Sequence, residues 1–318
     1  MSPENFNTID RRSVLKGLAG LGASAAFTGL LPAAVFAGPP VRKIHLFSKH
    51  LQWLDYDAMA ETAAAIGFDG IDLTVRPKGH VLPENVERDL PLAVAAIRAA
   101  GLIADRITTS VTDPADPLTA RILDMAAGQG IEIYRMGWLK YDRDRAIPEQ
   151  LDLFRARLEQ LASMNEKFGI HGAYQNHSGT GVGSPVWDAW LLTRDLDPRW
   201  LGVRYDVRHA MAEGTKSWEL GLQLLAPQIR SLDVKDFHWI EQNGAWDVES
   251  VPLGQGAVDF SHYFRLLEKW GVQADMTLHL EYPLGGADKG KSELTIPAED
   301  VKAAMKKDLD YLRSVNEQ

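Results

Sequence analysis

Residues 229–239 read IRSLDVKDFHW, and this stretch combines two patterns that rarely occur together. Apolar residues at three positions predict a buried β-strand. Asp233, Lys235 and Asp236 are charged, and an unpaired charge inside a protein costs several kcal/mol. The charges must therefore pair with other groups, or lie at the open end of a strand where they bind a metal ion or a substrate.

Outward from this stretch, short β-type runs alternate with longer amphipathic segments, several of which end at a glycine typical of a helix terminus. Alternation of this kind indicates a parallel sheet with helical crossovers, and eight strands indicate closure into a (β/α)8 TIM barrel, an α/β fold with a single domain at residues 38–318. A doubly wound open sheet is the alternative, but no GxGxxG motif follows the first strand and no linker divides the chain. The predicted strands are 42–48, 70–75, 103–111, 131–138, 171–178, 201–209, 229–237 and 275–283, and the clearest helical segments are 55–67, 90–101, 118–130, 149–169, 259–271 and 298–315.

Polar residues cluster late in five of these strands. In a barrel of this kind, the carboxyl ends of the strands carry the functional site. Residues two apart on a strand point to the same face, so Gln175 and His177 are expected on one face, and so are His279 and Glu281. The convergent set is Arg135 and Trp138, Gln175, Asn176 and His177, Asp206 and His209, Asp233, Lys235 and Asp236, and His279 and Glu281.

Composition limits the partners of the chain. The formal net charge of −9 over 318 residues gives no basic surface for nucleic acid, so no nucleic-acid partner is expected. Cysteine is absent, which excludes disulfides and thiolate metal sites, and any metal ion must be bound by oxygen or imidazole.

The first 37 residues have the pattern of an export signal. Asp10-Arg11-Arg12 precedes an apolar, small-residue run that ends at Ala37, followed by Gly38-Pro39-Pro40. This resembles a twin-arginine signal peptide, which implies recognition by the twin-arginine export machinery and a periplasmic or secreted destination. An N-terminal membrane anchor is the alternative, but Pro32 and several glycines interrupt the run. After cleavage no segment approaches the ~18 apolar residues of a membrane span, so no membrane association is expected.

Several motifs together resemble the xylose isomerase-like TIM-barrel family of sugar phosphate isomerases and epimerases. They are GFDGIDLTVRPKGHV at 67–81, QNHSG at 175–179, YDVRH at 205–209, DVKDF at 233–237, VPLGQGAVDF at 251–260 and LEY at 280–282. The resemblance covers nearly all of residues 41–315 and implies a TIM barrel that acts on carbohydrates, with one divalent cation, most often Mn²⁺ or Mg²⁺.

The resemblance also implies a set of metal ligands, and the chain departs from it at two positions. Gln175, Asp206, Asp233 and Glu281 match the ligand positions, but Gln175 stands where the family has Glu, and Asp233 where it has His. Four oxygen ligands with three negative charges still suit Mn²⁺ or Mg²⁺. In the family's reaction two glutamates move protons on either side of a metal-stabilised enediolate. An amide is no base at neutral pH.

Glu281 is therefore one expected catalytic residue, and the second proton carrier is sought among His177, His209, Lys235 and the more distant His80. Expected substrate contacts are Arg135, Trp138, His80 and Trp239, because flat aromatic faces stack on sugars.

Three functions remain open. The first is an exported, metal-dependent sugar isomerase or epimerase that acts on an unphosphorylated sugar or keto-sugar. The second is a metal-dependent lyase or hydratase of keto-glycosides, in which one base starts a β-elimination. The third is a non-catalytic sugar-binding barrel. The sequence leaves the sugar, the carbon attacked and the oligomeric state open.

Overall fold

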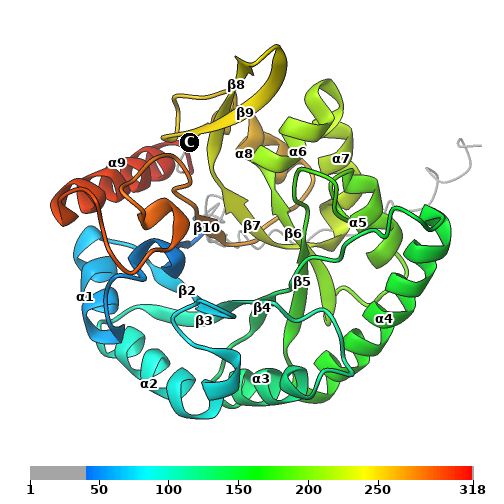
Figure 1. Cartoon of the computed structure of the whole chain (residues 1–318), viewed down its shortest axis with the longest axis horizontal. Coiled ribbons are helices and arrows are strands. Elements are labelled where there is room, and N and C mark those ends of the chain that lie inside the picture. The colour runs from blue at the N-terminus through cyan, green and yellow to red at the C-terminus, as the bar shows by residue number, and fades with distance from the viewer. Residues whose placement is uncertain (1–40, 317–318) are drawn as a thin grey trace, which may run out of the picture. The chain divides into compact units, whose positions relative to one another are not determined.

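The computed structural model describes residues 41–316, and the predicted signal segment 1–37 lies outside them. Eight parallel strands form a closed barrel in the order β1-β10-β7-β6-β5-β4-β3-β2, which confirms the predicted fold. Figure 1 shows the strands in the centre and the helices around them. The strands are β1 (Ile44–Phe47), β2 (Gly70–Val75), β3 (Ile103–Thr109), β4 (Ile133–Arg135), β5 (His171–Gln175), β6 (Leu201–Asp206), β7 (Ile229–Val234) and β10 (Met276–Leu278).

The helices cover the outside of the barrel and bury one face each against it. Sequence signals define their ends: Asp55 accepts a 2.9 Å hydrogen bond from the Ala58 N–H at the start of α1, and Gly67 ends this helix with a left-handed φ of 106°. The helices are α1 (Tyr56–Ile66), α2 (Val86–Ala99), α3 (Pro117–Gly128), α4 (Ile147–Phe168), α5 (Val186–Thr193), α6 (Val207–Gly214), α7 (Trp218–Leu225), α8 (Phe260–Lys269) and α9 (Ala298–Asn316). None of the helices in residues 41–316 is long and apolar enough to cross a membrane.

Seven of the eight barrel strands end earlier than predicted, whereas β2 has its predicted bounds. β10 ends at Leu278, so His279 and Glu281 follow the strand, and His209 lies in the first turn of α6. At the mouth of the barrel each strand diverges from the neighbouring strands. The residues that follow keep a high strand propensity, but their backbone groups have no strand to pair with. The predicted site residues nevertheless remain at the carboxyl ends of the strands.

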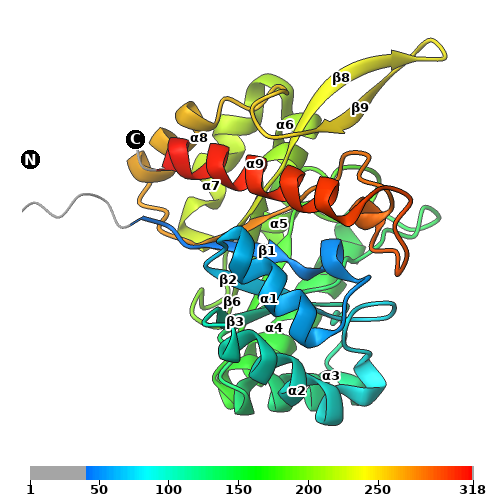
Figure 2. The same ribbon diagram turned by 90° about the vertical axis from the view of Figure 1, so that its left-hand side faces the viewer.

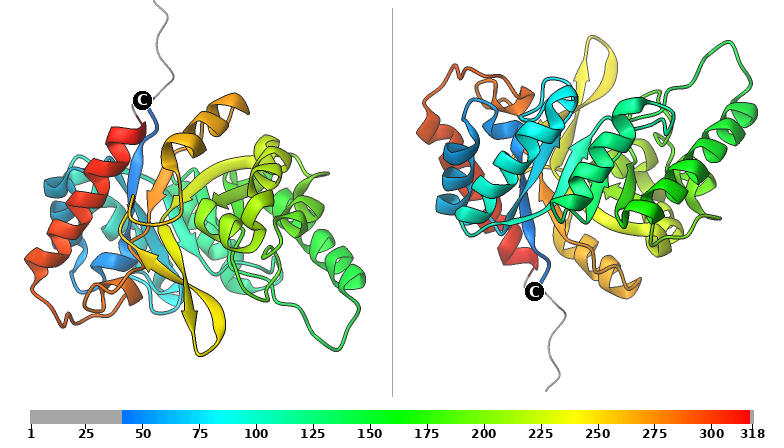
Figure 3. Two further views of the ribbon diagram at one scale, coloured as in Figure 1. Left: turned by 90° about the horizontal axis from the view of Figure 1, so that it is seen from above. Right: turned by 90° about the horizontal axis from the view of Figure 1, so that it is seen from below.

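A β-hairpin at residues 236–251 was not predicted. The stretch 229–239 contributes to two strands, because β7 ends at Val234 and β8 (Asp236–Gln242) pairs antiparallel with β9 (Ala245–Val251). Asn243 and Gly244 connect them with φ values of 54° and 75°, the left-handed pair of a type I′ turn. The hairpin projects from the barrel (Figure 2), and the projection is also visible from above and below (Figure 3). Lys235 is the single residue between the barrel strand and the hairpin.

Candidate active site at the carboxyl end of the barrel

A buried arginine links three strands inside the barrel. The Arg204 Nε on β6 lies 2.7 Å from both carboxylate oxygens of Asp233 on β7, and its Nη1 lies 2.6 Å from Asp72 Oδ2 on β2. All three side chains are essentially inaccessible to solvent. Burial works to raise the pKa of Asp233, but Arg204 and the His279 ring outweigh it and hold the pKa well below its usual range. Asp233 is therefore an ionised partner of Arg204.

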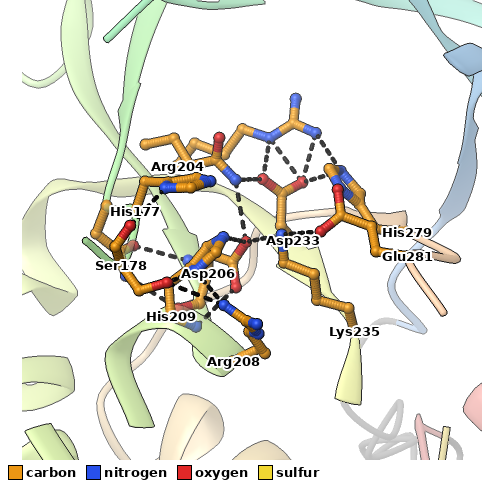
Figure 4. Close-up of polar contacts among 12 residues, drawn as sticks. His177, Ser178, Arg204, Asp206, Arg208, His209, Asp233, Lys235, His279 and Glu281 are labelled. Carbon is orange, nitrogen blue, oxygen red and sulfur yellow. Dashed lines mark hydrogen bonds and ion pairs between the residues drawn. The ribbon is translucent and has the colours of Figure 1, made fainter. Parts of the chain in front are cut away.

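Lys235 lies between two further carboxylates (Figure 4). Its ammonium nitrogen is 3.1 Å from Asp206 Oδ2 and 3.0 Å from Glu281 Oε2, while the Lys49 ammonium lies 3.2 Å from Glu281 Oε1. Burial lowers the pKa of Lys235, but Asp206, Glu281 and Asp233 outweigh it and raise the pKa above its ordinary value. Burial acts to raise the pKa of Glu281, yet Lys235, His279 and Lys49 bring the pKa well below normal. The Lys235 ammonium thus carries a stable positive charge at the mouth of the barrel.

The side-chain amide of Gln175 joins the two ionic groups. Its Nε2 donates hydrogen bonds to Asp206 Oδ2 at 3.0 Å and to Asp233 Oδ2 at 2.6 Å, and its Oε1 accepts one from the Arg135 Nη1 at 3.2 Å. A glutamate here would place a third carboxylate against two others. An amide instead supplies the donor that both carboxylates need, which explains this departure from the family pattern.

The four residues that the resemblance implies as metal ligands do lie together, but they do not fit a divalent cation. Arg204 occupies both oxygens of Asp233, and Lys235 bridges Asp206 and Glu281. Gln175 turns donor N–H groups toward the carboxylates rather than its oxygen. No group of three or more His, Asp or Glu side chains within the described part of the chain is arranged to bind a metal ion. The chain's own cations neutralise the carboxylates that would attract one.

Two histidines lie beside Lys235 and differ in what their nitrogens contact. The His209 Nδ1 accepts a hydrogen bond from the Arg208 Nη1 at 2.9 Å and lies 2.7 Å from Ser178 Oγ, which leaves the proton on Nε2, 3.5 Å from Asp206 Oδ2. The His177 Nδ1 lies 2.9 Å from the Ser178 carbonyl and donates to it, so its Nε2 is the basic nitrogen. Burial and then Lys235 lower the pKa of both rings, which are neutral at pH 7. His177 can accept a proton at Nε2, whereas His209 orients Asp206.

These groups surround a small cavity of about 60 Å³ that adjoins a larger one of about 440 Å³. Arg76, Arg135 and Trp138 line both, so the two cavities meet at the ends of β2 and β4. The larger volume falls in the range of small-molecule sites. The small cavity is lined by Phe47, Lys49, Arg76, Arg135, Trp138, Gln175, His177, Lys235, His279 and Glu281.

Two predicted substrate contacts lie elsewhere, and neither lines these cavities. The His80 Nδ1 is 3.2 Å from Ser48 Oγ and its Nε2 is 3.2 Å from the Leu51 carbonyl oxygen, so both nitrogens support the loop after β2. Burial, the largest effect, lowers its pKa to about 4. Trp239 lies on β8, 41% exposed, with its ring against Phe237. His80 thus supports the loop after β2 and Trp239 belongs to the hairpin, while their contact with substrate stays a prediction.

Sequence reasoning missed two cations, Lys49 and Arg76. Strand alternation places Arg204 on the same face as Asp206 but gives it no role. Lys49 and Arg76 each follow the end of a barrel strand, where site residues are expected.

A closed parallel barrel with an ionic mouth and an adjoining cavity defines the class of (β/α)8 barrels with a small-molecule site at the carboxyl end of the strands. The pattern of the xylose isomerase-like TIM barrel family matches residues 60–315. The chain belongs to this family, whose distant members include sugar isomerases and epimerases.

Solved structures with the same fold share little sequence with the chain. A xylose isomerase-like TIM barrel protein from Mycobacterium smegmatis in complex with magnesium is 15% identical, with a TM-score of 0.63, over 86% of this chain and 96% of that one. The 3-keto-D-glucoside 4-epimerase from E. coli is 16% identical, with a TM-score of 0.62, over 86% of this chain and 99% of that one. A D-allulose 3-epimerase from Methylomonas sp. in complex with D-allulose is 16% identical, with a TM-score of 0.63, over 87% of this chain and 98% of that one. No match is found among the curated proteins.

Proposed function

We propose that the protein is a carbohydrate isomerase or epimerase that moves a proton at the carbon next to a carbonyl group. The observation that carries this proposal is the position of the Lys235 ammonium, between Asp206 and Glu281, in a cavity that His177 also lines. Membership of a family with sugar isomerases and epimerases supports it.

In this proposal His177 is the base and Lys235 the electrophile. A neutral imidazole with a free Nε2 removes the proton next to the carbonyl, while a fixed ammonium stabilises the negative charge that develops on the carbonyl oxygen. Glu281 holds Lys235 in place, and its lowered pKa leaves it ionised, so it has no proton to return to the substrate. His177 therefore delivers the proton that it removed to the neighbouring carbon, which balances an isomerisation. Asp206 and His209 position these groups without contacting substrate. Arg135 and Trp138, which line both cavities, contact the sugar.

The magnesium or manganese ion of the family is not part of this mechanism. A divalent ion at Gln175, Asp206, Asp233 and Glu281 would have to displace Lys235 and break the contacts of Arg204. The Mycobacterium smegmatis relative was solved in complex with magnesium, and a divalent ion at such a site would polarise the carbonyl oxygen. Here Lys235 supplies the positive charge for the same task.

The test is exchange of the substrate's carbon-bound hydrogen with solvent. Neutral hexoses, keto-sugars and sugar acids are incubated with the enzyme in D₂O and followed by NMR for deuterium at the carbon next to the carbonyl. His177→Gln and Lys235→Met are each expected to slow exchange by about 10²–10⁴-fold. Glu241→Gln, on the projecting hairpin, is the control and should have no effect. Absence of exchange with every sugar would contradict the proposal and favour a sugar-binding barrel.

A lyase reaction is the second candidate. It is favoured by the presence of one strong base, His177, because β-elimination needs only a single base next to the carbonyl, whereas epimerisation needs a proton donor on the opposite face. Release of an unsaturated keto-sugar, detected by ultraviolet absorbance, would identify a lyase. Reversible deuterium incorporation without such a product would identify an isomerase or epimerase.

We also propose export through the twin-arginine machinery, on the pattern of residues 1–37. Replacing Arg11 and Arg12 together with lysine should retain the full-length chain in the cytoplasm, while the natural sequence yields a shortened chain in the periplasm. Cell fractionation with mass spectrometry of the mature N-terminus measures this. An unprocessed chain in the membrane fraction would indicate an anchor.

A further inference from the structure

The larger cavity, at the ends of β2, β3 and β4, has an unusual charge. Its lining contains four cationic side chains and no aspartate or glutamate. The cations come from the loop after β2, the end of β4 and η5 (Ala287–Lys289). Hydroxyl groups after β3 and the amide of Gln52 complete the polar lining. The cations are Arg76, Lys78, Arg135 and Lys289, and the hydroxyls belong to Thr109, Ser110 and Thr112.

Arg135 is a buried positive charge without a carboxylate partner. It is 3% exposed and lies 4.4 Å above the Trp138 ring. The Arg135 guanidinium donates hydrogen bonds to two neutral oxygens, the Gln175 side-chain oxygen at 3.2 Å and the Thr109 backbone oxygen at 3.4 Å. It forms no ion pair with any residue in 41–316. Burial, followed by the nearby Arg204 and Arg76, lowers its pKa to about 9. A buried unpaired charge is costly, so an anion that reaches it is stabilised.

Arg76 is a second cation without a partner. Its guanidinium lies 5.3 Å from the Phe47 ring centroid, and forms no hydrogen bond or ion pair with the described residues. The loop that carries it is held in place, because the Val81 N–H donates to the Thr74 carbonyl oxygen at 3.0 Å and the Arg76 N–H to Val81 at 3.1 Å. Lys78 adopts a left-handed φ of 62° within this loop, a strained conformation for a residue with a side chain. The structure thus fixes Arg76 at the cavity without satisfying its charge.

The acidic groups nearby do not neutralise these cations. Asp72 and Asp233 are bound by Arg204, and Asp206 and Glu281 by Lys235 and Lys49. The linings of the two cavities together contain six cations and a single carboxylate, Glu281; the cations are Lys49, Arg76, Lys78, Arg135, Lys235 and Lys289. In a protein with a net charge of −9, this local positive excess marks a site for a negatively charged group.

We propose that this cavity binds the carboxylate of an acidic sugar, whose carbonyl end reaches Lys235 and His177 in the adjoining small cavity. This inference rests on the proposed function and names its substrate class. A guanidinium group matches a planar carboxylate with two parallel N–H···O bonds, and Arg76 and Arg135 both have N–H groups available. The sugar ring lies between the carboxylate and the carbonyl, against Trp138, which lines both cavities.

The experiment measures binding by calorimetry, so that it needs no turnover. The probes are D-glucuronate, its neutral methyl ester, D-glucose and glucose 6-phosphate. The wild-type protein is expected to bind glucuronate at least about tenfold more tightly than the ester or glucose. Arg76→Met should remove about tenfold of this affinity and leave the affinity for the neutral sugars unchanged. Arg121→Met, which removes an exposed arginine paired with Glu87 on the outer surface, is the matched control and should have no effect.

Equal affinity for glucuronate and its ester would overturn the proposal, and so would an Arg76→Met variant that binds glucuronate normally. Tighter binding of glucose 6-phosphate would overturn the carboxylate assignment. The deuterium experiment separates this proposal from the proposed function. A sugar acid that binds through Arg76 without hydrogen exchange supports the cavity and contradicts the reaction. Exchange with neutral sugars alone supports the reaction and contradicts the cavity assignment.

Discussion

Arg204 is the residue on which the polar interior of the barrel depends. Replacing it with methionine leaves Asp72 and Asp233 buried without a cation, and we expect a loss of about 3–5 kcal/mol in the free energy of unfolding. Urea unfolding followed by circular dichroism measures the loss. Arg199→Met, an exposed arginine paired only with Asp197, is the control and should change stability by less than about 1 kcal/mol. Similar values for the two variants would contradict the ionic link.

Lys235 gives a direct test of the metal assignment. Elemental mass spectrometry of the natural protein, purified without chelator, should give far less than one equivalent of any divalent metal. Lys235→Ala removes the ammonium from between Asp206 and Glu281, and we expect this variant to gain a thermal stabilisation by Mn²⁺ that the natural protein lacks. Lys302→Ala on α9, outside the mouth, is the control. One tightly bound equivalent in the natural protein would restore the four-residue metal site.

At the residue scale, the sequence predicted which side chains meet but not how they pair. Strand alternation brought Gln175, Asp206, Asp233 and Glu281 to one mouth, and the structure places them there. Which side chains form ion pairs and hydrogen bonds depends on which inward-facing residues lie at the same level along the barrel axis. That level is set by the stagger of the strands. Nothing in residues 201–206 alone shows that Arg204 reaches across to β2.

At the element scale, the hairpin β8–β9 is separable from the barrel. Its tip is exposed, with Trp246 at 72%, and its cross-strand contacts are mostly within itself. Replacing residues 240–247 with a Gly-Asn-Gly turn should therefore change the melting temperature by no more than about 3 °C, as measured by calorimetry. A larger loss would show that the hairpin tip supports the barrel. Loss of sugar binding at unchanged stability would instead assign the hairpin a role at the mouth.

The hairpin also shows where sequence reasoning at this scale stopped. Asn243-Gly244 between two β-type runs is a strong hairpin signal. It was obscured because β-type residues occur on both sides of Lys235, so the sequence reads as one strand over 229–237. The change from the barrel strand to the hairpin occurs at Lys235.

The contact between α9 and the loop after β10 makes stability depend on pH. The Tyr282 hydroxyl donates a 3.0 Å hydrogen bond to Asp308, whose side chain is 1% exposed. Burial, the largest effect, raises the pKa of Asp308 from 3.8 to about 6. The folded state therefore favours the protonated acid, so this group's contribution of about 3 kcal/mol is full below pH 4 and is lost as the pH rises through 6.

We expect Asp308→Asn, which stays neutral, to stabilise the protein by about 1–3 kcal/mol at pH 8 and to have little effect at pH 4. Urea unfolding at both pH values measures the difference. Asp310→Asn, which changes an exposed aspartate two residues further along α9, is the control. Equal effects of Asp308→Asn at the two pH values would contradict the raised pKa.

At the scale of the whole molecule, the number and order of the barrel strands followed from the alternation of patterns, since seven successive crossovers between parallel strands leave few ways to close the sheet. The charge distribution did not follow from composition. A chain with a net charge of −9 still gathers six cations around the two cavities at the mouth.

The ion pair between Arg204 and Asp233 also constrains how the sequence can change over time. Restoring the family's histidine at position 233 alone would leave the guanidinium with only Asp72, and replacing Arg204 alone would leave two carboxylates facing each other in the core. Each single change lowers stability, and because both act on the same ion pair, their effects on the free energy of unfolding are non-additive. Positions 204 and 233 are therefore coupled: the residue tolerated at one depends on the residue at the other.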